Sequence, residues 1–169
     1  MLQVRAETMI ICLDVDYRET SVVTACVGFH AWTDAASARE HVVHSAEPAA
    51  AYEPGKFFER ELPYLRAAIA GFGELIDLAI VDGYVWLDGG RPGLGAHLHA
   101  ELGVPVVGIA KTHYAGADAI AVTRGESASP LFITAAGLDP AVAAAHVVAM
   151  VGPFRIPTLI KRADTLARS

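Results

Sequence analysis

Three apolar runs in this chain each end abruptly at a charged residue. The runs cover residues 9–13, 78–81 and 104–110, and the charged residues that follow them are Asp14, Asp82 and Lys111. Short apolar runs that stop at a polar residue are typical of buried strands, so each acid is expected at the last residue of a core strand. In open α/β sheets, ligands gather at strand ends of this kind. The pattern therefore predicts an α/β fold with two carboxylates and one ammonium group around a site for metal and phosphate.

The order of the apolar and polar segments predicts the remaining elements. Two strands at 9–14 and 21–29 are expected to form a hairpin through the polar turn at 16–20. A third short strand near 41–44 would complete an antiparallel meander. Later segments are expected to form helices at 56–72, 93–102 and 140–151, and an outer strand at 130–134. Because the chain contains neither an internal repeat nor a linker, we expect one domain spanning residues 1–169.

Helical spacing separates two glutamates in the segment 56–72. At about 100° per residue the apolar side chains share one arc, and Glu61 falls inside this arc whereas Glu59 falls outside it. A carboxylate on a core-facing side is costly unless it is paired, hydrogen-bonded or coordinating a cation. We therefore expect Glu61 to be functional, with a structural ion pair as the alternative. Pro63 leaves another alternative open, because it could mark a later helix start.

The charge balance limits what the chain can bind. Its formal net charge is −6 at pH 7, which argues against a protein that coats nucleic acid through a basic stripe. A small basic site beside bound cations stays possible, because such ions invert the local field. The sequence contains no signal peptide and no apolar run near the ~18 residues of a membrane span. We therefore expect a cytoplasmic protein, with Cys12 and Cys26 as buried free thiols.

The glycine-rich stretch after Asp82 does not fit a nucleotide-binding loop. It lacks both the Gly-x-Gly-x-x-Gly pattern and a Gly-Lys-Ser/Thr ending. A helix at 93–102 that stops at Gly103 agrees better with the spacing of its leucines. His97 flanks this leucine stripe and is the histidine we select as a site candidate, with a core histidine as the alternative. The basic tail at 154–164 indicates a solvated C-terminus unless it packs beside the site.

Several short motifs occur in an order that resembles the endonuclease V family of nucleases. They are Asp14-Val15-Asp16-Tyr17; Tyr52-x-Pro54-Gly55 followed by Arg60-Glu61-x-Pro63; Val81-Asp82-Gly83; His97; Gly108-Ile109-Ala110-Lys111; Pro130-Leu131-Phe132-Ile133; and Arg155-Ile156-Pro157 with Arg162-Ala163-Asp164. Each motif is weak alone, but their shared order over residues 9–165 indicates homology. The resemblance implies a ribonuclease H-like fold, with a mixed β-sheet that begins as an antiparallel three-strand meander and is flanked by helices.

The resemblance also implies roles for individual residues. Asp14, Asp82 and Glu61 would be the acids that hold Mg²⁺ or Mn²⁺. Lys111 would steady the scissile phosphate or the attacking water. The implied nucleic-acid contacts are Tyr52, Pro54, Gly55, Gly83 and His97, with Tyr52 stacking beside the lesion base. These roles are chemically coherent, because hard cations prefer carboxylate oxygen and lower the pKa of bound water.

The implied activity is a metal-dependent endonuclease of DNA repair that nicks DNA or RNA 3′ to a deaminated adenine (inosine), leaving a 3′-hydroxyl and a 5′-phosphate. Two departures from the family pattern concern the metal. Asp88 stands where a histidine is usual and is expected to offer an extra oxygen, and Leu138 stands where a metal-associated histidine precedes the last helix. Together they predict weak Mg²⁺ binding with partial rescue by Mn²⁺. Two other functions stay open: a non-cleaving relative that binds nucleic acid or protein, and a hydrolase of a small deaminated nucleotide.

Overall fold

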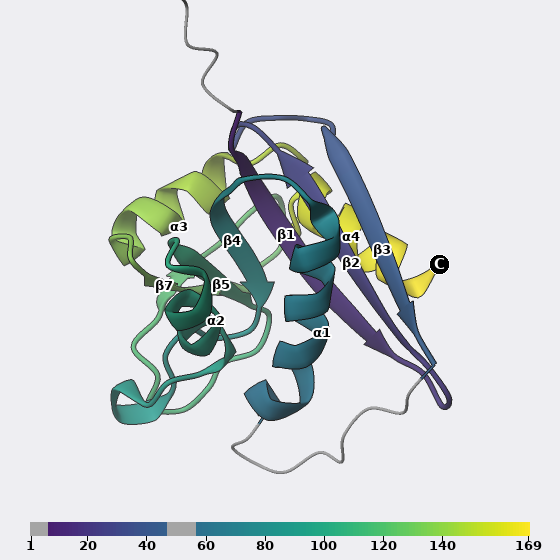
Figure 1. Cartoon of the computed structure of the whole chain (residues 1–169). Coiled ribbons are helices and arrows are strands. Elements are labelled where there is room, and N and C mark those ends of the chain that lie inside the picture. The colour runs from purple at the N-terminus through teal and green to yellow at the C-terminus, as the bar shows by residue number, and fades with distance from the viewer. Residues whose placement is uncertain (1–6, 47–56) are drawn as a thin grey trace, which may run out of the picture.

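The chain folds around one seven-stranded mixed sheet with helices on both faces (Figure 1). The computed structural model describes residues 7–46 and 57–169. The strands are β1 (Met9–Tyr17), β2 (Val22–Phe29), β3 (Arg39–Ser45), β4 (Ile76–Asp82), β5 (Val106–Ala110), β6 (Ile120–Val122) and β7 (Leu131–Ala136), in the spatial order β3-β2-β1-β4-β5-β7-β6. The helices are α1 (Phe57–Phe72), α2 (Leu94–Leu102), α3 (Pro140–Ala149) and α4 (Thr158–Arg168), with a short 3₁₀ turn η1 (Asp88–Gly90). The predicted α/β class is confirmed.

The first three strands form the predicted antiparallel meander. β1 pairs with β2 from Ile10↔Phe29 to Tyr17↔Val22, and β2 pairs with β3 from Val22↔Ser45 to Gly28↔Arg39. The turn between β1 and β2 is tight, with the Arg18 amide donating to the Ser21 carbonyl at 2.8 Å. β1 is therefore longer than the sequence predicted. The expectation that Asp14 is the last residue of its strand is wrong, because the backbone stays extended and paired with β2 up to Tyr17.

The parallel strands in the middle of the sheet diverge at one point. β1 and β4 pair only as far as Cys12↔Ile80. Beyond it, β1 follows β2, whereas β4 stays beside β5 as far as Asp82↔Ile109. A gap therefore opens between the C-terminal parts of β1 and β4, and side chains from both faces of the sheet can approach each other there. Ligand sites of open α/β sheets are found at such positions.

Alternation along the strands supplies a core on each face of the sheet. In β1, Ile10 and Cys12 belong to the apolar cluster under α3 and α4, whereas Ile11 and Leu13 belong to the cluster under α1 and α2. In Figure 1, α1 and α2 lie in front of the sheet, and α3 and α4 lie behind it. The end of the sheet at which β1 and β4 diverge is therefore flanked by helices from both layers.

The helices agree with the predicted start and stop signals. α1 begins at Phe57 and continues through Pro63, so the alternative of a helix that starts at this proline is wrong. α2 ends at Gly103, which adopts the left-handed conformation with φ +70°. α3 begins after Asp139, whose side chain accepts a hydrogen bond from the Ala141 amide at 2.8 Å. Among the helices in the described part of the chain, none combines the length and apolar character needed to cross a membrane.

Candidate active site

Carboxylates from three elements repel one another electrostatically where β1 and β4 diverge. Asp14 lies on β1, Asp82 is the last residue of β4, and Glu61 comes from α1. The charge of Asp82 raises the pKa of both Asp14 and Glu61, and Asp14 adds to the effect on Glu61. Asp14 and Asp82 also line one small pocket together with Lys111. The structure therefore brings together the four residues that the sequence selected as catalytic.

Glu61 is the most deeply buried of these acids. Only 7% of the residue is exposed, whereas Glu59 on the same helix is exposed, as the helical spacing predicted. Burial, then Asp82 and Asp14, raise the pKa of Glu61 to about 8. Its Oε2 atom is buried without a hydrogen-bond partner. A buried carboxylate oxygen with no partner is costly, so this atom points to a ligand.

Asp14 is only partly buried, and its surroundings act on it in opposite directions. Burial and the charges of Asp82 and Asp164 raise its pKa to about 6. The Val15 amide donates to Asp14 Oδ1 at 3.0 Å, and this hydrogen bond favours the ionised form. Asp14 therefore loses its proton before Glu61 does, and its charge then opposes ionisation of Glu61. Without a cation, the site holds fewer negative charges at neutral pH than it has carboxylates.

The backbone around Asp82 and Lys111 is closely packed. Gly83 follows Asp82 with φ +123°, a conformation that turns the chain away from the sheet. A Cβ on Gly108 would lie 2.5 Å from the Gly83 carbonyl oxygen, so only glycine permits this approach of β5. Lys111 directly follows β5, and its Nζ lies 3.6 Å from Asp82 Oδ2. An acid and an ammonium group expected at strand ends thus lie close together, because β4 and β5 are neighbours in the sheet.

Arg155 ties the loop before α4 to the strand end that carries Lys111. Its Nη2 donates to the Lys111 carbonyl at 2.6 Å and to the Pro130 carbonyl at 2.8 Å, and its Nε donates to the Ser129 carbonyl at 3.0 Å. The loop itself is held by the buried Arg124, which donates to the carbonyls of Met150, Gly152, Phe154 and Arg155. Two arginines therefore hold the main chain at Lys111 in place.

α4 contributes a fourth carboxylate, Asp164, to which the sequence analysis assigned no role. Asp164 lines the same pocket as Asp14 and Asp82, and it receives hydrogen bonds at 2.8 Å from both Lys161 and Arg168. Of the two outcomes that the sequence left open for this segment, the structure shows the second, because α4 packs on β1 and β2 beside the site rather than forming a solvated tail. The signal that could have revealed it is the helical spacing of its buried apolar residues, Leu159, Ala163 and Ala167.

The donor set suits a hard divalent cation. Carboxylate oxygens are the ligands that Mg²⁺ and Mn²⁺ prefer, and the mutual repulsion of these acids is what a cation would relieve. The orphaned Glu61 oxygen fits the same role. Within residues 7–46 and 57–169, however, no three His, Cys, Asp or Glu side chains lie close enough together to coordinate one metal ion. The fit to a cation therefore rests on the chemistry of these carboxylates and on the unpartnered Glu61 oxygen.

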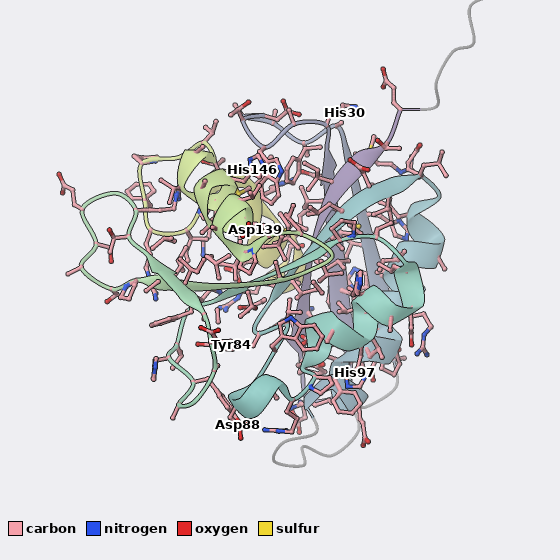
Figure 2. All side chains as sticks on the ribbon, turned by 90° about the vertical axis from the view of Figure 1, so that its left-hand side faces the viewer. His30, Tyr84, Asp88, His97, Asp139 and His146 are labelled. Atoms are coloured by element: carbon pink, nitrogen blue, oxygen red, sulfur yellow. The ribbon has the colours of Figure 1, made fainter. Side chains whose placement is uncertain are left out.

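The remaining selected residues are Gly83 next to Asp82, His97 on α2, and three residues outside the described part of the chain. His97 stacks on Phe58 in the first turns of α1, with ring centroids 3.9 Å apart. In Figure 2, His97 and Asp88 lie at the lower end of the molecule, away from His30 and His146 at the upper end. Gly83 lines a second, open groove next to Asp82. The predicted nucleic-acid contacts Tyr52, Pro54 and Gly55 fall outside the described residues.

Asp88 and Leu138, the two residues that depart from the family pattern, do not line the pocket of Asp14 and Asp82. Asp88 is exposed and accepts a hydrogen bond from Arg91 Nη2 at 2.8 Å, which lowers the pKa of Asp88. Its charge is absent from those that shift Asp14 and Glu61, so the structure does not support the extra oxygen that we expected from it. Leu138 packs against the apolar cluster under α3. The side of the site next to Asp14 is instead formed by α4, through Asp164.

This chain is similar to known proteins along most of its length. The family model for endonuclease V matches residues 2–137. An endonuclease V from Geotalea uraniireducens is 32% identical over 92% of this chain and 74% of its own length. An endonuclease V from Streptomyces avermitilis is 30% identical over 69% of this chain, and the match spans 60% of that relative.

Solved structures with the same arrangement were also found. The crystal structure of endonuclease V from Streptomyces avermitilis superposes with a TM-score of 0.76 at 25% identity, covering 96% of this chain and 81% of that one. A Ciona intestinalis endonuclease V, in complex with a DNA 24mer that contains an inosine followed by a ribo-adenosine, gives a TM-score of 0.73 at 17% identity, covering 95% and 84%. The predicted ribonuclease H-like fold is thereby confirmed.

Proposed function

The chain belongs to the endonuclease V family, and from this premise we propose that it is an endonuclease that hydrolyses a phosphodiester 3′ to a deaminated base, inosine, in DNA or RNA. The observation that carries the proposal is the group formed by Asp14, Glu61 and Asp82, whose charges oppose one another beside the Lys111 ammonium. The Ciona relative bound to inosine-containing DNA supports the choice of lesion.

We propose Mg²⁺ as the cofactor, with Mn²⁺ as a substitute, held by Asp14, Asp82 and Glu61. When bound, a divalent cation supplies a water of lowered pKa and neutralises charge on the phosphate. The protein needs no nucleophilic side chain, and its own contribution is the placement of these groups. The three carboxylates come from β1, β4 and α1, which are packed elements rather than loops, and this limits their motion.

Lys111 is proposed to bind a non-bridging oxygen of the scissile phosphate. Its ammonium lies 3.6 Å from Asp82, so it is close to the acids without closing a tight ion pair. Its main chain is held by Arg155. An ammonium group held at this position stabilises the extra negative charge that the phosphate gains in the transition state.

The open groove beside Asp82 is proposed to receive the deaminated base. It is lined by Asp82, Gly83, Tyr84, Ala110, Lys111, Thr112, His113 and Tyr114. Tyr84 fixes one wall, because its hydroxyl donates to the Thr112 carbonyl at 2.7 Å and accepts from the Tyr114 amide at 3.0 Å. Such a groove suits a base taken out of the stack, a step that is cheapest for a weakly paired lesion. Tyr52 is proposed to stack beside that base.

The test is cleavage of oligonucleotides that differ only at one base. Single- and double-stranded DNA and RNA with one inosine, the adenosine-matched strands, and free inosine nucleotides are incubated with Mg²⁺, Mn²⁺ or a chelator. We expect a nick 3′ to inosine that requires the cation, with a 3′-hydroxyl and a 5′-phosphate. Hydrolysis of the free nucleotides alone would favour a small-molecule hydrolase. Binding without cleavage under every metal condition would favour a non-cleaving relative.

A further inference from the structure

Arg60 differs from the other arginines in the described part of the chain. Six of those arginines pair with a carboxylate, as Arg18–Asp16, Arg39–Glu74, Arg66–Glu101, Arg91–Asp88, Arg162–Glu40 and Arg168–Asp164. Arg124 and Arg155 donate to backbone carbonyls. Arg60 makes neither kind of contact within residues 7–46 and 57–169, although the acidic Glu61 is its neighbour in the sequence. This is unusual in a protein with a formal net charge of −6.

The Arg60 side chain is nevertheless held in a defined place. Its guanidinium carbon lies 3.9 Å from the centroid of the Tyr17 ring. The Tyr17 ring in turn meets Tyr64, one helical turn beyond Arg60, at 6.1 Å and 81°. A guanidinium that stacks on an aromatic face keeps its N–H donors pointing outward in its own plane. The side chain is half-buried, so part of it faces solvent.

Unsatisfied polar atoms gather at this place. In the described residues, the buried side-chain atoms without a hydrogen-bond partner are Tyr17 Oη, Arg60 Nε, Glu61 Oε2 and Arg124 Nε. All but the last belong to this cluster on α1 and the end of β1. Glu61 is an acceptor and fits the proposed cation, whereas Arg60 offers donors and a positive charge. Because Nε is covered, an anion would meet the outer N–H groups of this half-buried guanidinium.

We propose that Arg60 binds an uncleaved phosphodiester of the substrate strand, next to the bond that is cut, with Tyr17 and Tyr64 as its platform. The inference rests on the proposed nuclease function. A guanidinium fork matches two phosphate oxygens, and Arg60 lies in the first turns of α1, where the helix dipole favours an anion. Tyr17 lies three residues beyond Asp14, about 10 Å along the strand at ~3.4 Å per residue, so this phosphate lies away from Asp14, on the Glu61 side of the carboxylates.

The competing explanation is that Arg60 binds no phosphate and only changes the pKa of Glu61. The charge of Arg60 lowers the pKa of Glu61, against the larger effects of burial and of the other acids. Loss of this charge would then shift the pH dependence of cleavage without changing how many phosphates the protein contacts. The two explanations therefore differ in the salt dependence of binding.

The experiment measures the binding of an inosine-containing DNA oligonucleotide at several salt concentrations, with Ca²⁺ in place of Mg²⁺ and with the strand checked for cleavage. We expect Arg60→Gln to weaken binding about tenfold and to reduce the slope of log K against log salt by about 0.7 to 0.9, the contribution of one phosphate contact. Arg66→Gln is the matched control, because Arg66 lies on the same helix, is exposed, and pairs with Glu101. Its slope should equal that of the wild type.

Two further arms keep the result specific. Arg60→Lys retains the charge but not the fork, so it should keep the slope and bind with intermediate affinity. Methylphosphonates, which remove the charge of one phosphate, are placed one at a time around the lesion. At one uncleaved position the substitution should weaken DNA binding by the wild type but should not further weaken DNA binding by Arg60→Gln. An unchanged slope in a folded Arg60→Gln protein, with cleavage by the wild type intact, would overturn this inference alone. A wild type that neither binds nor cuts the inosine strand would overturn the proposed function as well.

Discussion

Replacing Glu61 by glutamine should stabilise the metal-free protein in a way that depends on pH. Glu61 is 7% exposed, and burial together with Asp82 and Asp14 raises its pKa from the ordinary value of 4.5 to about 8. A raised acid pKa means that the folded protein binds a proton that the unfolded chain has released. The stability of the wild type therefore falls as the pH rises from about 4.5 to about 8.

The size of the effect follows from the same shift. Keeping the proton on Glu61 at pH 7.5 costs about 1.4 kcal/mol for each pH unit above 4.5, or about 4 kcal/mol in all. Glutamine has nearly the same shape and no charge, so it escapes this cost, and its amide can donate to the neighbouring carboxylates. We expect the free energy of unfolding to rise by about 2 to 4 kcal/mol at pH 7.5 and by less than about 1 kcal/mol at pH 5.

The assay is urea unfolding of the wild type and Glu61→Gln in chelator at pH 5, 6, 7 and 8. Glu59→Gln is the control, because Glu59 is exposed on the same helix and should change stability by less than about 0.5 kcal/mol at every pH. In cleavage assays, Glu61→Gln should be severely impaired and Glu59→Gln should not. A destabilised Glu61→Gln protein, or a gain of the same size at pH 5 and pH 8, would refute the argument that repulsion and burial shift this acid.

Three further predictions concern other residues. Asp14→Asn and Asp82→Asn should each abolish cleavage of the inosine strand while leaving the fold intact or more heat-stable, because one of two facing carboxylates is removed; activity within a few-fold of wild type would remove that residue from the metal site. Arg155→Lys should lower kcat about tenfold with little change in KM, since a lysine cannot hold the carbonyls of Lys111, Pro130 and Ser129 together; unchanged kcat would show that Lys111 needs no such support. Tyr52→Ala should weaken discrimination of inosine from adenosine more than it slows cleavage of the favoured strand, because base stacking contributes ~1–3 kcal/mol; unchanged selectivity would indicate that Tyr52 only packs in its loop.

Local patterns predicted the parts of this site that depend on local geometry. The arc of apolar residues in α1 separated the buried Glu61 from the exposed Glu59, because helical periodicity alone decides which face meets the core. The abrupt end of an apolar run likewise placed Asp82 and Lys111 each at the end of a strand. These inferences needed only the chain segment that contains each residue.

The features that were missed depend on contacts between distant segments. Asp14 is not the end of its strand, because pairing with β2 keeps β1 extended to Tyr17. Asp164 reaches the carboxylates only because α4 packs across β1 and β2, and its sequence also suits a solvated tail. The partner of Asp88 is Arg91, a surface ion pair within one loop. Which of these acids joins the site is decided by packing, on which local periodicity carries no information.

We propose that the carboxylates at the divergence of β1 and β4 hold a divalent cation, and this can be tested directly. The most direct measurement is anomalous diffraction from crystals of this protein soaked in Mn²⁺, with chelator-treated crystals as the control. We expect an anomalous peak between the carboxylates of Asp14 and Asp82, which is lost in crystals of Asp82→Asn. A fully soaked crystal with no peak at these carboxylates, or with Mn²⁺ ordered only at Asp88, would contradict it.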